Sequence, residues 1–336
     1  MRVVEVREPF GIDSVVFTTR PDPTAGPRDV VVRLSALSLN YRDRLVIDGI
    51  DRWRPRGPRI PVSDGAGVVV ATGSAVTRFR TGDRVAPIFY PKWIDHQPAP
   101  EKMQGALGGA AADGLYSEYA VIDETAAVTV PSHLSDEEAA TLPCAALTAW
   151  NGVAEGAPLR DGDTVVVLGT GGVGLFALQF AKLFGARAII TSSSDSKLAR
   201  ACELGADGGI NYRTTPDWPR ALRELTDGRG ADLVVDTAGA LAEAIDAVRV
   251  GGTVAFIGLL LGTHSDVDLV KLMGSSATIR AIDVGSRAMF ESMNRAIESA
   301  KLRPVIDRRY DFAQMAEAHA YVEKGHKKGN VVISLK

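Results

Sequence analysis

The sequence has little of what builds disulfide scaffolds, membrane spans or nucleic-acid surfaces. Its 336 residues include only two cysteines, Cys144 and Cys202, which are too few for a disulfide framework and suit a reducing compartment. No apolar run approaches the roughly 18 residues of a transmembrane helix. The net charge of −3 and the pI near 6.0 leave no strongly basic surface. We therefore expect no nucleic-acid or membrane partner. We also expect a cytoplasmic location, because residues 1–10 carry charges where a signal peptide needs an apolar core.

What the sequence does contain suits two globular domains. Hydrophobic residues make up 46% of the chain and charged residues 24%, the usual proportions for a packed core with a solvated surface. The chain is also longer than the roughly 250–300 residues that one core usually serves. The first part is predicted to form short strands separated by turns, at 30–34, 67–71 and 85–88, followed by a loop at 91–114.

Strands and helices alternate in the second part of the chain, after a helix that Ser135 is predicted to cap. Strands are predicted at 165–168, 188–191, 233–236 and 253–257, with helices at 195–204 and 241–248. The tail adds helices at 289–300 and 314–325 and a strand at 331–335. Alternation at this spacing predicts βαβ units with a parallel sheet, so the expected fold class is α/β.

The most informative segment is a glycine-rich turn between a predicted strand and a predicted helix. Residues 165–185 read VVVLGTGGVGLFALQFAKLFG, in which an apolar strand gives way to glycines and then to an amphipathic helix. Such glycines allow a tight turn, a close approach to a pyrophosphate and close packing of helix on strand. The helix N-terminus then offers free N–H groups to the phosphates. We interpret Gly171, Gly172 and Val173 as part of a dinucleotide site, although a purely structural glycine-rich turn would have the same sequence pattern.

Several further motifs, taken together, resemble one known superfamily. The resemblance is to the medium-chain dehydrogenase/reductases, and within them to the zinc-less, quinone-oxidoreductase-like (zeta-crystallin-like) members. It rests on SLNYRD (38–43), PVSDGAGVV (61–69), GDRV (82–85), LPCAALTAW (142–150), GTGGVG (169–174), INYR (210–213), DVGSR (283–287) and RPVID (303–307).

The resemblance implies a particular architecture and assembly. A GroES-like, β-rich catalytic domain, made of residues 1–124 and 283–336, would enclose a Rossmann domain at 125–282, with the active site in the cleft between them. It also implies a homodimer that pairs through the edge of the Rossmann sheet. We place that edge at 278–283, a short β-branched run that can extend a sheet across a two-fold axis.

The resemblance also raises the question of a catalytic metal. Zinc-dependent members carry Cys, His and Cys where this chain has Asn40, Ser63 and Cys144. A catalytic zinc needs three protein ligands, usually thiolate or imidazole, and only Cys144 qualifies. The five histidines show no ligand spacing. Asp43 and Asp64 match acidic residues that lie near the metal in those relatives, and we interpret them as hydrogen-bonding groups of the cleft. We expect no bound metal.

The choice of nicotinamide cofactor depends on the end of the second Rossmann strand. NAD sites of this type place an acidic residue there, but this chain has Ser192-Ser193-Ser194, whose hydroxyls can donate to a 2′-phosphate. Lys197 follows one helical turn later and supplies charge. Asp195 would favour NAD, unless it is the N-cap or a first-turn acid of the next helix. By resemblance, residues matching Lys197 and Tyr212 flank the adenosine 2′-phosphate, so we predict NADPH.

The resemblance places further residues around the cofactor. It puts Thr148 beside the nicotinamide, the backbone around Gly258 and Val284 along the carboxamide, and Asn330 near the pyrophosphate. Thr148 has an alternative interpretation as a helix residue that bonds the carbonyl four residues earlier.

The candidate catalytic residues are Asn40, Tyr41 and Asp43, which lie together in SLNYRD at the cleft. Tyr41 can donate a hydrogen bond to a substrate carbonyl or quinone oxygen, or it can be a packed aromatic with an exposed hydroxyl. The predicted substrate pocket combines Asp64 with a set of apolar side chains, which core residues would equally explain: Phe89, Tyr90, Trp93 and Ile94.

One departure from the superfamily bears on the reaction. Alcohol dehydrogenases keep Ser or Thr as a proton relay where this chain has Arg42. Without a Lewis acid or that hydroxyl, hydride transfer to a quinone or an α,β-unsaturated carbonyl is favoured, because the charge delocalises over a conjugated system. We expect an apolar conjugated substrate. An NADP-linked alcohol or aldehyde dehydrogenase without zinc, and a non-catalytic NADPH-binding protein, remain the alternatives.

Overall fold

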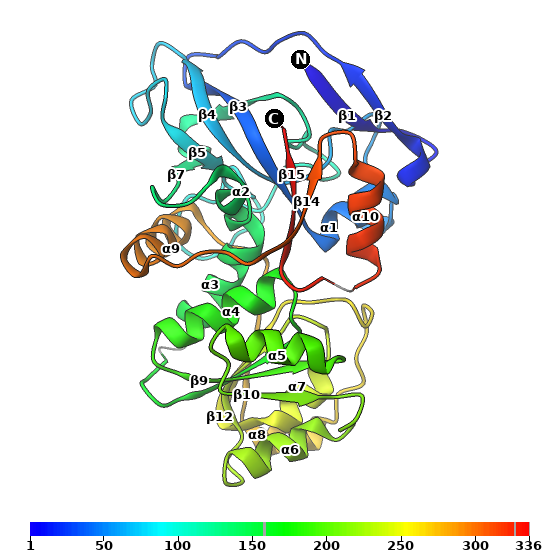
Figure 1. Ribbon diagram of the computed structural model, residues 1–336, viewed down its shortest axis with the longest axis vertical. Helices are drawn as coiled ribbons and strands as arrows, with labels where there is room; N and C mark the ends of the chain where they lie inside the picture. Colours follow the sequence, from blue (N-terminus) through cyan, green and yellow to red (C-terminus); the bar gives the residue numbers. More distant parts are fainter. Residues whose placement is uncertain (157–158, 326, 336) are drawn as a thin grey trace. The chain divides into compact units, whose positions relative to one another are not determined.

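The computed structural model describes residues 1–156, 159–325 and 327–335, and it divides into two compact units (Figure 1). Unit 1 comprises Met1–Leu147 and Gly285–Lys336, and unit 2 comprises Thr148–Val284. The sequence places these divisions at 124/125 and 282/283. Residues 125–147 fall in unit 1 because strand β7 (Ala127–Thr129) pairs antiparallel with β5 (Arg84–Pro87) of that unit.

Unit 1 is built on a seven-stranded, largely antiparallel sheet in the order β14-β15-β3-β4-β5-β7, with β6 paired to β3. Its middle is the long, mostly buried strand β3. Only β14 and β15 run parallel. Strands β1 and β2 form a separate hairpin. The remaining strands of this unit are β1 (Arg2–Val6), β2 (Val15–Thr19), β3 (Asp29–Leu39), β4 (Asp64–Thr72), β6 (Tyr119–Asp123), β14 (Ile306–Asp311) and β15 (Asn330–Ser334).

The helices of unit 1 are short, apart from α9. Ser135 caps α2 as predicted, because its side chain accepts the N–H of Glu138. The predicted loop at 91–114 contains no helix or strand. The helices are α1 (Tyr41–Ile47), α2 (Asp136–Ala139), α9 (Arg287–Ala300) and α10 (Met315–Glu323), with single turns at η1 (Ile12–Ser14), η2 (Asp51–Trp53), η3 (Glu124–Ala126) and the π-helical η4 (Leu142–Ala146).

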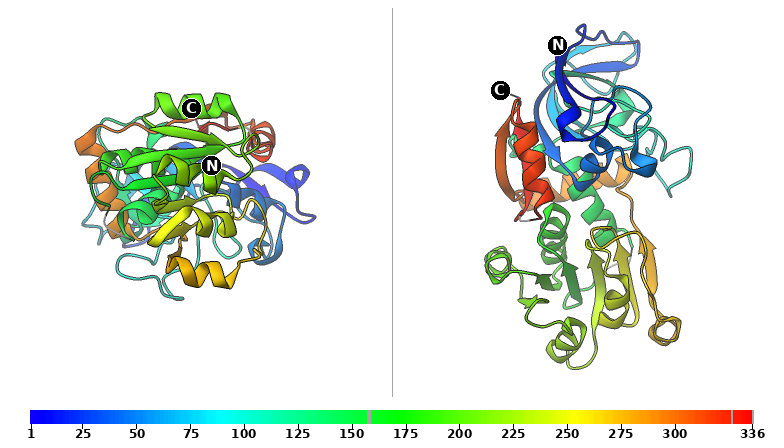
Figure 2. Two further views of the ribbon diagram at one scale, coloured as in Figure 1. Left: turned by 90° about the horizontal axis from the view of Figure 1, so that it is seen from below. Right: turned by 90° about the vertical axis from the view of Figure 1, so that its right-hand side faces the viewer.

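Unit 2 is a six-stranded parallel sheet in the order β10-β9-β8-β11-β12-β13. Helices cover both of its faces (Figure 2). The strands are β8 (Thr164–Leu168), β9 (Arg187–Ser192), β10 (Gly208–Asn211), β11 (Ala231–Asp236), β12 (Val248–Phe256) and β13 (Thr278–Ala281). The helices are α3 (Leu147–Ala154), which begins on the last residue of unit 1, α4 (Gly172–Leu183), α5 (Asp195–Glu203), α6 (Trp218–Leu225), α7 (Leu241–Ala247) and α8 (Leu269–Ser275).

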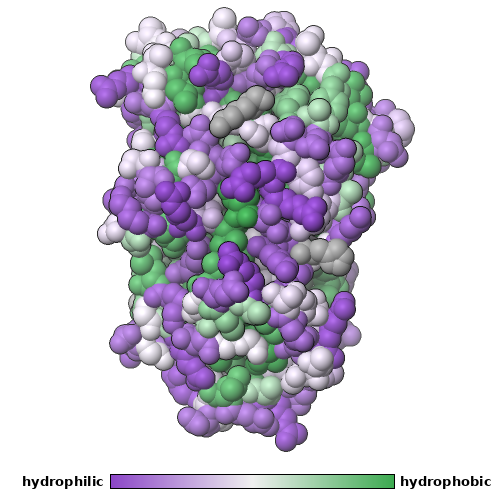
Figure 3. All heavy atoms as spheres, viewed as in Figure 1, coloured by the Kyte–Doolittle hydropathy of each residue, from purple (hydrophilic) through white to green (hydrophobic). Residues whose placement is uncertain are grey.

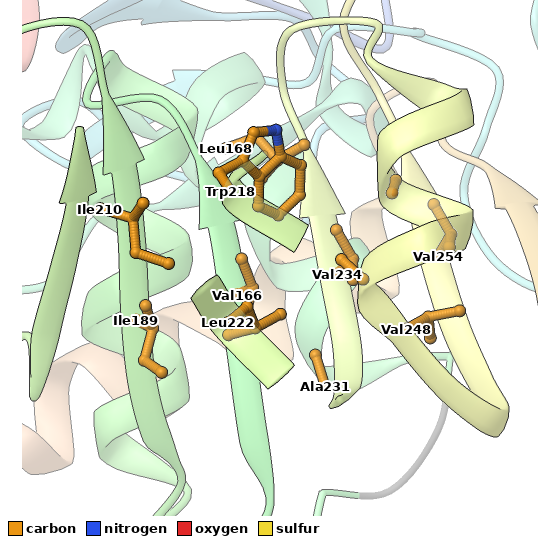
Figure 4. Packing of buried hydrophobic residues seen from close by; sticks show 12 residues of the cluster. Val166, Leu168, Ile189, Ile210, Trp218, Leu222, Ala231, Val234, Val248 and Val254 are labelled. Atoms are coloured by element: carbon orange, nitrogen blue, oxygen red, sulfur yellow. The ribbon is translucent and has the colours of Figure 1, made fainter. Parts of the chain in front are cut away.

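The core of unit 2 explains why its strands are continuous apolar runs. Val166, Ile189 and Val234 lie on adjacent strands, and Trp218 and Leu222 of α6 pack over them (Figure 4). A parallel sheet with both faces covered needs apolar side chains on both sides of each strand. The predicted α/β fold class, with a parallel sheet in one unit and a β-rich second unit, is therefore confirmed.

The strand order creates a switch point between β8 and β11, where successive connections pass to opposite sides of the sheet. Ligands of open α/β sheets bind beyond the carboxyl ends of the strands at such a point. On the face shown in Figure 3, hydrophilic residues surround smaller hydrophobic groups. Among the described residues, no helix combines the length and apolarity that a bilayer crossing requires.

Candidate functional site

The glycine-rich turn lies at the switch point of unit 2 and begins helix α4. Gly169 follows β8 with φ of +103°, a conformation that side chains rarely adopt. A Cβ on Gly174 would lie 2.1 Å from the Gly169 carbonyl oxygen, so only glycine allows this approach of helix to strand. Gly171 caps α4, and Gly172 and Val173 form its first turn. The helix N-terminus offers N–H groups and partial positive charge to an anion.

The end of strand β9 gathers the residues predicted to contact the adenosine phosphate. Ser192 ends β9 and is buried, and Ser193 follows it half-buried. Lys197 lies in the first turn of α5. The N–H of Tyr212 donates to the Ser192 carbonyl oxygen at 3.1 Å, which brings the end of β10 against the end of β9. The Tyr212 side chain is 44% exposed.

Asp195 is the residue that would favour NAD over NADPH. It is the first residue of α5, as the sequence predicted for a first-turn acid. Its Oδ1 accepts a hydrogen bond of 2.6 Å from the Asn211 side-chain amide. The carboxylate thus has a structural partner within this unit.

Gly258, Val284 and Thr148 also belong to the cofactor residues predicted in unit 2. Gly258 follows β12, and a Cβ there would lie 1.9 Å from the Thr237 carbonyl oxygen. Val284 is buried with φ of +61°, and its carbonyl oxygen accepts from the Asn151 amide at 2.6 Å. Thr148 is buried on α3.

Sequence reasoning missed Asp236, which ends strand β11 and is fully buried. Its Oδ1 accepts the N–H groups of Ala238 and Gly239. Burial raises the pKa of this carboxyl, and these backbone hydrogen bonds oppose the rise. The signal in the sequence is an acidic residue directly after the apolar run Leu233-Val234-Val235.

Unit 1 brings two of the predicted catalytic residues, Asn40 and Asp43, close to Asp64 of the predicted substrate pocket. Ser63 and Asp64 have no exposed surface, and the Ser63 hydroxyl donates to Asp64 Oδ1 at 2.6 Å. The Cys144 N–H donates to Asp64 Oδ2 at 2.9 Å. Asp43 Oδ2 accepts the N–H of Asn40, which caps α1. The sheet brings these residues together because β4 begins at Asp64.

The electrostatics of these residues are unusual. Burial raises the pKa of Asp64 to about 7; the Ser63 hydroxyl opposes that rise and the nearby Asp43 carboxyl adds to it. The Asn40 amide lies beside Asp64 and also favours its ionised form, although its nitrogen makes no hydrogen bond of ordinary geometry within the described residues. Burial also raises the pKa of Asp43, against the attraction of Arg42.

The donors at these positions fit zinc poorly. Asn40 offers an amide, Ser63 already donates to a carboxyl, and Cys144 supplies one sulfur. Within residues 1–156, 159–325 and 327–335, no three His, Cys, Asp or Glu side chains are arranged to hold a metal ion. His326 lies outside those residues.

Tyr41 and the predicted apolar pocket also lie in unit 1. Tyr41 is the first residue of α1 and is half-buried. Phe89, Tyr90 and Trp93 are buried and pack edge to face or tilted, as core aromatics do, whereas Ile94 is half-buried. The sequence left open whether these rings line a substrate pocket or belong to the core, and their burial is what core residues would show.

Arg42 and Asn330 have defined partners within unit 1. Arg42 donates to the carbonyl oxygens of Leu107 and Gly108 and lies over the Phe89 ring, 4.6 Å from its centre. Arg42 therefore anchors the 91–114 loop through these two carbonyl oxygens. Asn330 begins β15 and is buried, with its amide donating to the Val305 carbonyl oxygen at 3.1 Å.

Two family models match the chain in the expected order. Residues 26–132 match the alcohol dehydrogenase GroES-like domain, and residues 172–299 match the zinc-binding dehydrogenase family. Curated relatives are similar along nearly their whole length. A zinc-type alcohol dehydrogenase-like protein of Schizosaccharomyces pombe is 39% identical over 92% of this chain and 91% of the relative. A quinone oxidoreductase of Pseudomonas aeruginosa is 32% identical over 92% and 91%.

Solved structures agree with these relatives. A putative alcohol dehydrogenase from Sinorhizobium meliloti has a TM-score of 0.90 and 44% identity, covering 96% of this chain and 95% of that one. A structure described as an NAD-dependent alcohol dehydrogenase has a TM-score of 0.90 and 35% identity, with 100% of both chains covered. The chain therefore belongs to the medium-chain dehydrogenase/reductase superfamily of oxidoreductases, which bind nicotinamide cofactors.

Proposed function

We propose that this chain is a zinc-independent, NADPH-dependent oxidoreductase that transfers hydride to a quinone or an α,β-unsaturated carbonyl. The observation that carries the proposal is the donor set of unit 1. The Ser63 hydroxyl donates a hydrogen bond to Asp64, and by resemblance Asn40, an amide, stands where zinc-dependent relatives have a thiolate. A catalytic zinc needs three good ligands, and one thiolate does not retain the ion.

Apart from Asn330 of unit 1, the residues that would hold NADPH are in unit 2. The cofactor supplies the hydride when bound. The N-terminus of α4 would bind the pyrophosphate, and Ser192, Ser193, Lys197 and Tyr212 would hold the 2′-phosphate. A lysine and hydroxyls suit a dianionic phosphate, because charge-assisted hydrogen bonds are the strong ones. The hydrogen bond between Asp195 and Asn211 supports an interpretation of Asp195 as a structural acid.

A conjugated acceptor suits the residues of unit 1. As hydride arrives, negative charge spreads over the conjugated system and onto an oxygen. Tyr41 would donate a hydrogen bond to that oxygen, and the donation strengthens as the oxygen gains charge. Water would supply the proton. This scheme requires neither a Lewis acid nor the hydroxyl relay that Arg42 replaces.

The names of the relatives favour a second candidate, an alcohol or aldehyde dehydrogenase. The S. pombe relative is called zinc-type alcohol dehydrogenase-like, and one similar structure is described as NAD-dependent. A non-catalytic NADPH-binding protein is the third candidate. It would bind the cofactor tightly without oxidising it in the presence of any acceptor.

An acceptor screen separates the three candidates. NADPH and NADH oxidation would be followed with quinones, enones and aldehydes, and NAD(P)⁺ reduction with simple alcohols. We expect turnover with NADPH and a quinone or enone. Turnover of simple alcohols as the best substrates would contradict the proposal and favour the second candidate, whereas tight binding without any turnover would favour the third.

We also propose that the protein is a homodimer that pairs through β13. This strand is at the edge of the unit 2 sheet, and Ile279 on it is 37% exposed. The neighbouring helix α8 has no buried residue, and its Leu269, Val270 and Met273 are at least 68% exposed. An apolar edge of this kind suits a second copy of the chain. Sedimentation that shows a monomer at micromolar concentration would contradict this.

A further inference from the structure

Val284 has an unusual backbone conformation for its residue type. Its φ is +61°, in the left-handed region that β-branched residues avoid. The residue is 3% exposed, so the protein interior holds it there. Such conformations are strained and persist only where neighbouring groups impose them. The surroundings of Val284 should therefore contain the groups that hold it.

The group that contacts the Val284 backbone is the Asn151 side chain on helix α3. Asn151 Nδ2 donates to the Val284 carbonyl oxygen at 2.6 Å, and the Asn151 side chain is buried. Its Oδ1 accepts from Arg280 Nη2 at 3.0 Å, and Arg280 Nη1 donates to the Asn151 carbonyl oxygen at 3.3 Å. An arginine only donates and a carbonyl only accepts, so the amide has one orientation that satisfies both partners.

Arg280 is itself positioned by the chain around it. It lies half-buried on strand β13. A Cβ on Gly156 would lie 1.7 Å from Arg280 Nη1, so the absence of a side chain at 156 leaves the space that the guanidinium occupies. Asn151, Arg280 and the Val284 carbonyl thus form a connected unit, called here the Val284 clamp, which joins α3, β13 and the segment after β13.

The clamp lies at the carboxyl edge of the sheet. The Ile282 N–H donates to the Phe256 carbonyl oxygen at 2.9 Å, which places residue 282 at the end of β12 and Val284 beyond it. The glycine turn after β8 is at the same edge. A dinucleotide spans the switch point of such a sheet. If its adenosine lies over β9, its nicotinamide lies on the side of β11 and β12, which is the side of Val284.

We propose that Asn151 and Arg280 are positioning residues, which hold the Val284 backbone in the conformation that receives the nicotinamide half of the cofactor. Neither residue needs to touch the cofactor. The proposal rests on nicotinamide cofactor binding at this edge, and it is independent of which acceptor is reduced.

Binding of a cofactor and of its fragment tests the clamp. NADPH and 2′-phospho-ADP-ribose, which lacks nicotinamide, would be titrated into wild type, Asn151→Ala and Asn151→Asp by calorimetry. Loss of a buried hydrogen bond of this type predicts about 10-fold weaker NADPH binding. Fragment affinity should stay within about 2-fold. Lys197→Ala is the matched control, because it should weaken both ligands.

A second variant protects the test against general unfolding. Glycine adopts positive φ readily, so the backbone at residue 284 should keep its conformation in Val284→Gly without the hydrogen bond from Asn151. Asn151→Ala should then cost NADPH affinity less in the Val284→Gly background than in wild type, a non-additivity that general destabilisation does not produce. Thermal unfolding of each variant would be measured in parallel.

The outcomes separate the clamp from the proposed function. Unchanged NADPH affinity in both Asn151 variants, equal losses for NADPH and the fragment, or full additivity with Val284→Gly would each overturn the clamp alone. Wild type that binds no nicotinamide cofactor would overturn both proposals. If wild type prefers NADH, the same comparison with NADH and ADP-ribose tests the clamp, while the NADPH assignment fails.

Discussion

Asp64 in unit 1 and Asp232 in unit 2 are buried carboxyl groups with opposite surroundings. Asp64 in unit 1 contacts a hydroxyl and a backbone N–H, and its charged neighbour is another acid, Asp43. Asp232 in unit 2 accepts from Arg229 at 2.6 Å and Arg249 at 2.5 Å. Burial alone would raise the pKa of both. The two arginines lower the pKa of Asp232, whereas the pKa of Asp64 rises to about 7.

The arginine partners thus decide whether a buried carboxyl of this protein is ionised near neutral pH. In unit 2 the backbone of the glycine turn is fixed and two arginines hold Asp232 ionised, whereas Asp236 resembles Asp64 in that burial raises its pKa. In unit 1 burial raises the pKa of Asp64 to about 7, so this carboxyl changes its protonation near neutral pH. The following predictions test this comparison of the two units, beginning with the largest effect.

Gly174→Ala should have the largest effect, because the backbone of unit 2 leaves no room for a Cβ. The new atom would lie 2.1 Å from the Gly169 carbonyl oxygen and would push α4 away from β8. We expect NADPH affinity to fall by at least about 100-fold, since the pyrophosphate depends on that helix N-terminus. Calorimetry measures this. Gly274→Ala is the matched control, because this glycine lies in α8 with nothing within 4 Å of the added Cβ. It should leave NADPH affinity unchanged.

Lys197→Ala tests whether unit 2 holds a fixed charge for the 2′-phosphate. Loss of a charge-assisted hydrogen bond costs about 1.5–3 kcal/mol, or roughly 10- to 150-fold in NADPH affinity. NADH affinity should not change. Arg200→Ala removes a cation from the same helix, where it pairs with Glu203, and should affect neither cofactor. Equal affinities of wild type for NADPH and NADH would refute the assignment.

Tyr41→Phe tests whether unit 1 responds to charge that develops on the substrate. The change keeps the ring and removes the donor, so turnover with the best acceptor should fall about 10-fold. NADPH affinity should be unchanged. Steady-state kinetics and calorimetry measure the two effects, with Tyr119→Phe on β6 as the control. Unaltered turnover would leave Tyr41 as a packing residue.

The pH dependence of stability tests the two carboxyls directly and should give the smallest effect near neutral pH. Folded Asp64 holds its proton more tightly than the unfolded chain does, so the free energy of unfolding falls as pH rises from about 4 to about 7. Asp64→Asn should flatten that part of the curve. Asp232 has the opposite sign, since its stabilisation is present above about pH 4 and is lost as pH falls below that value.

Asp232→Asn serves as the matched variant for this comparison. It should change the curve below about pH 4 and leave its slope between pH 4 and 7 as in wild type. Urea unfolding across pH 3 to 8 gives both slopes. Equal slopes for wild type and Asp64→Asn between pH 4 and 7 would show that Asp64 is ionised as an ordinary carboxylate.

The sequence predicted unit 2 well because its strands are buried on both faces. The predicted strand at 165–168 lies within β8, and that at 233–236 within β11. Strand β10 was missed, because Gly208-Gly209-Ile210-Asn211 has low β propensity and gains its order from pairing with β9. Helices α6 and α8 were also missed.

The side-chain networks could not be predicted from local pattern. Arg280 and Asn151 are 129 positions apart, and no periodicity relates them. Cys144 and Asp64 meet only because the sheet of unit 1 has formed. Family resemblance supplied the candidate residues, whereas their burial and partners required the structure. The buried rings of Phe89, Tyr90 and Trp93 could not be placed from the sequence either, because a pocket rim and a protein core use the same apolar residue types.

The most direct test of the account is whether hydride transfer proceeds without a metal. Protein purified without a metal-binding tag would be analysed for zinc and assayed for NADPH oxidation with its best quinone or enone, before and after EDTA treatment. We predict well below one zinc per chain and the same turnover in both assays, because by resemblance Asn40 and Ser63 stand at two of the three positions where zinc-dependent relatives have ligands. One zinc per chain, with turnover that EDTA abolishes and added zinc restores, would contradict the account.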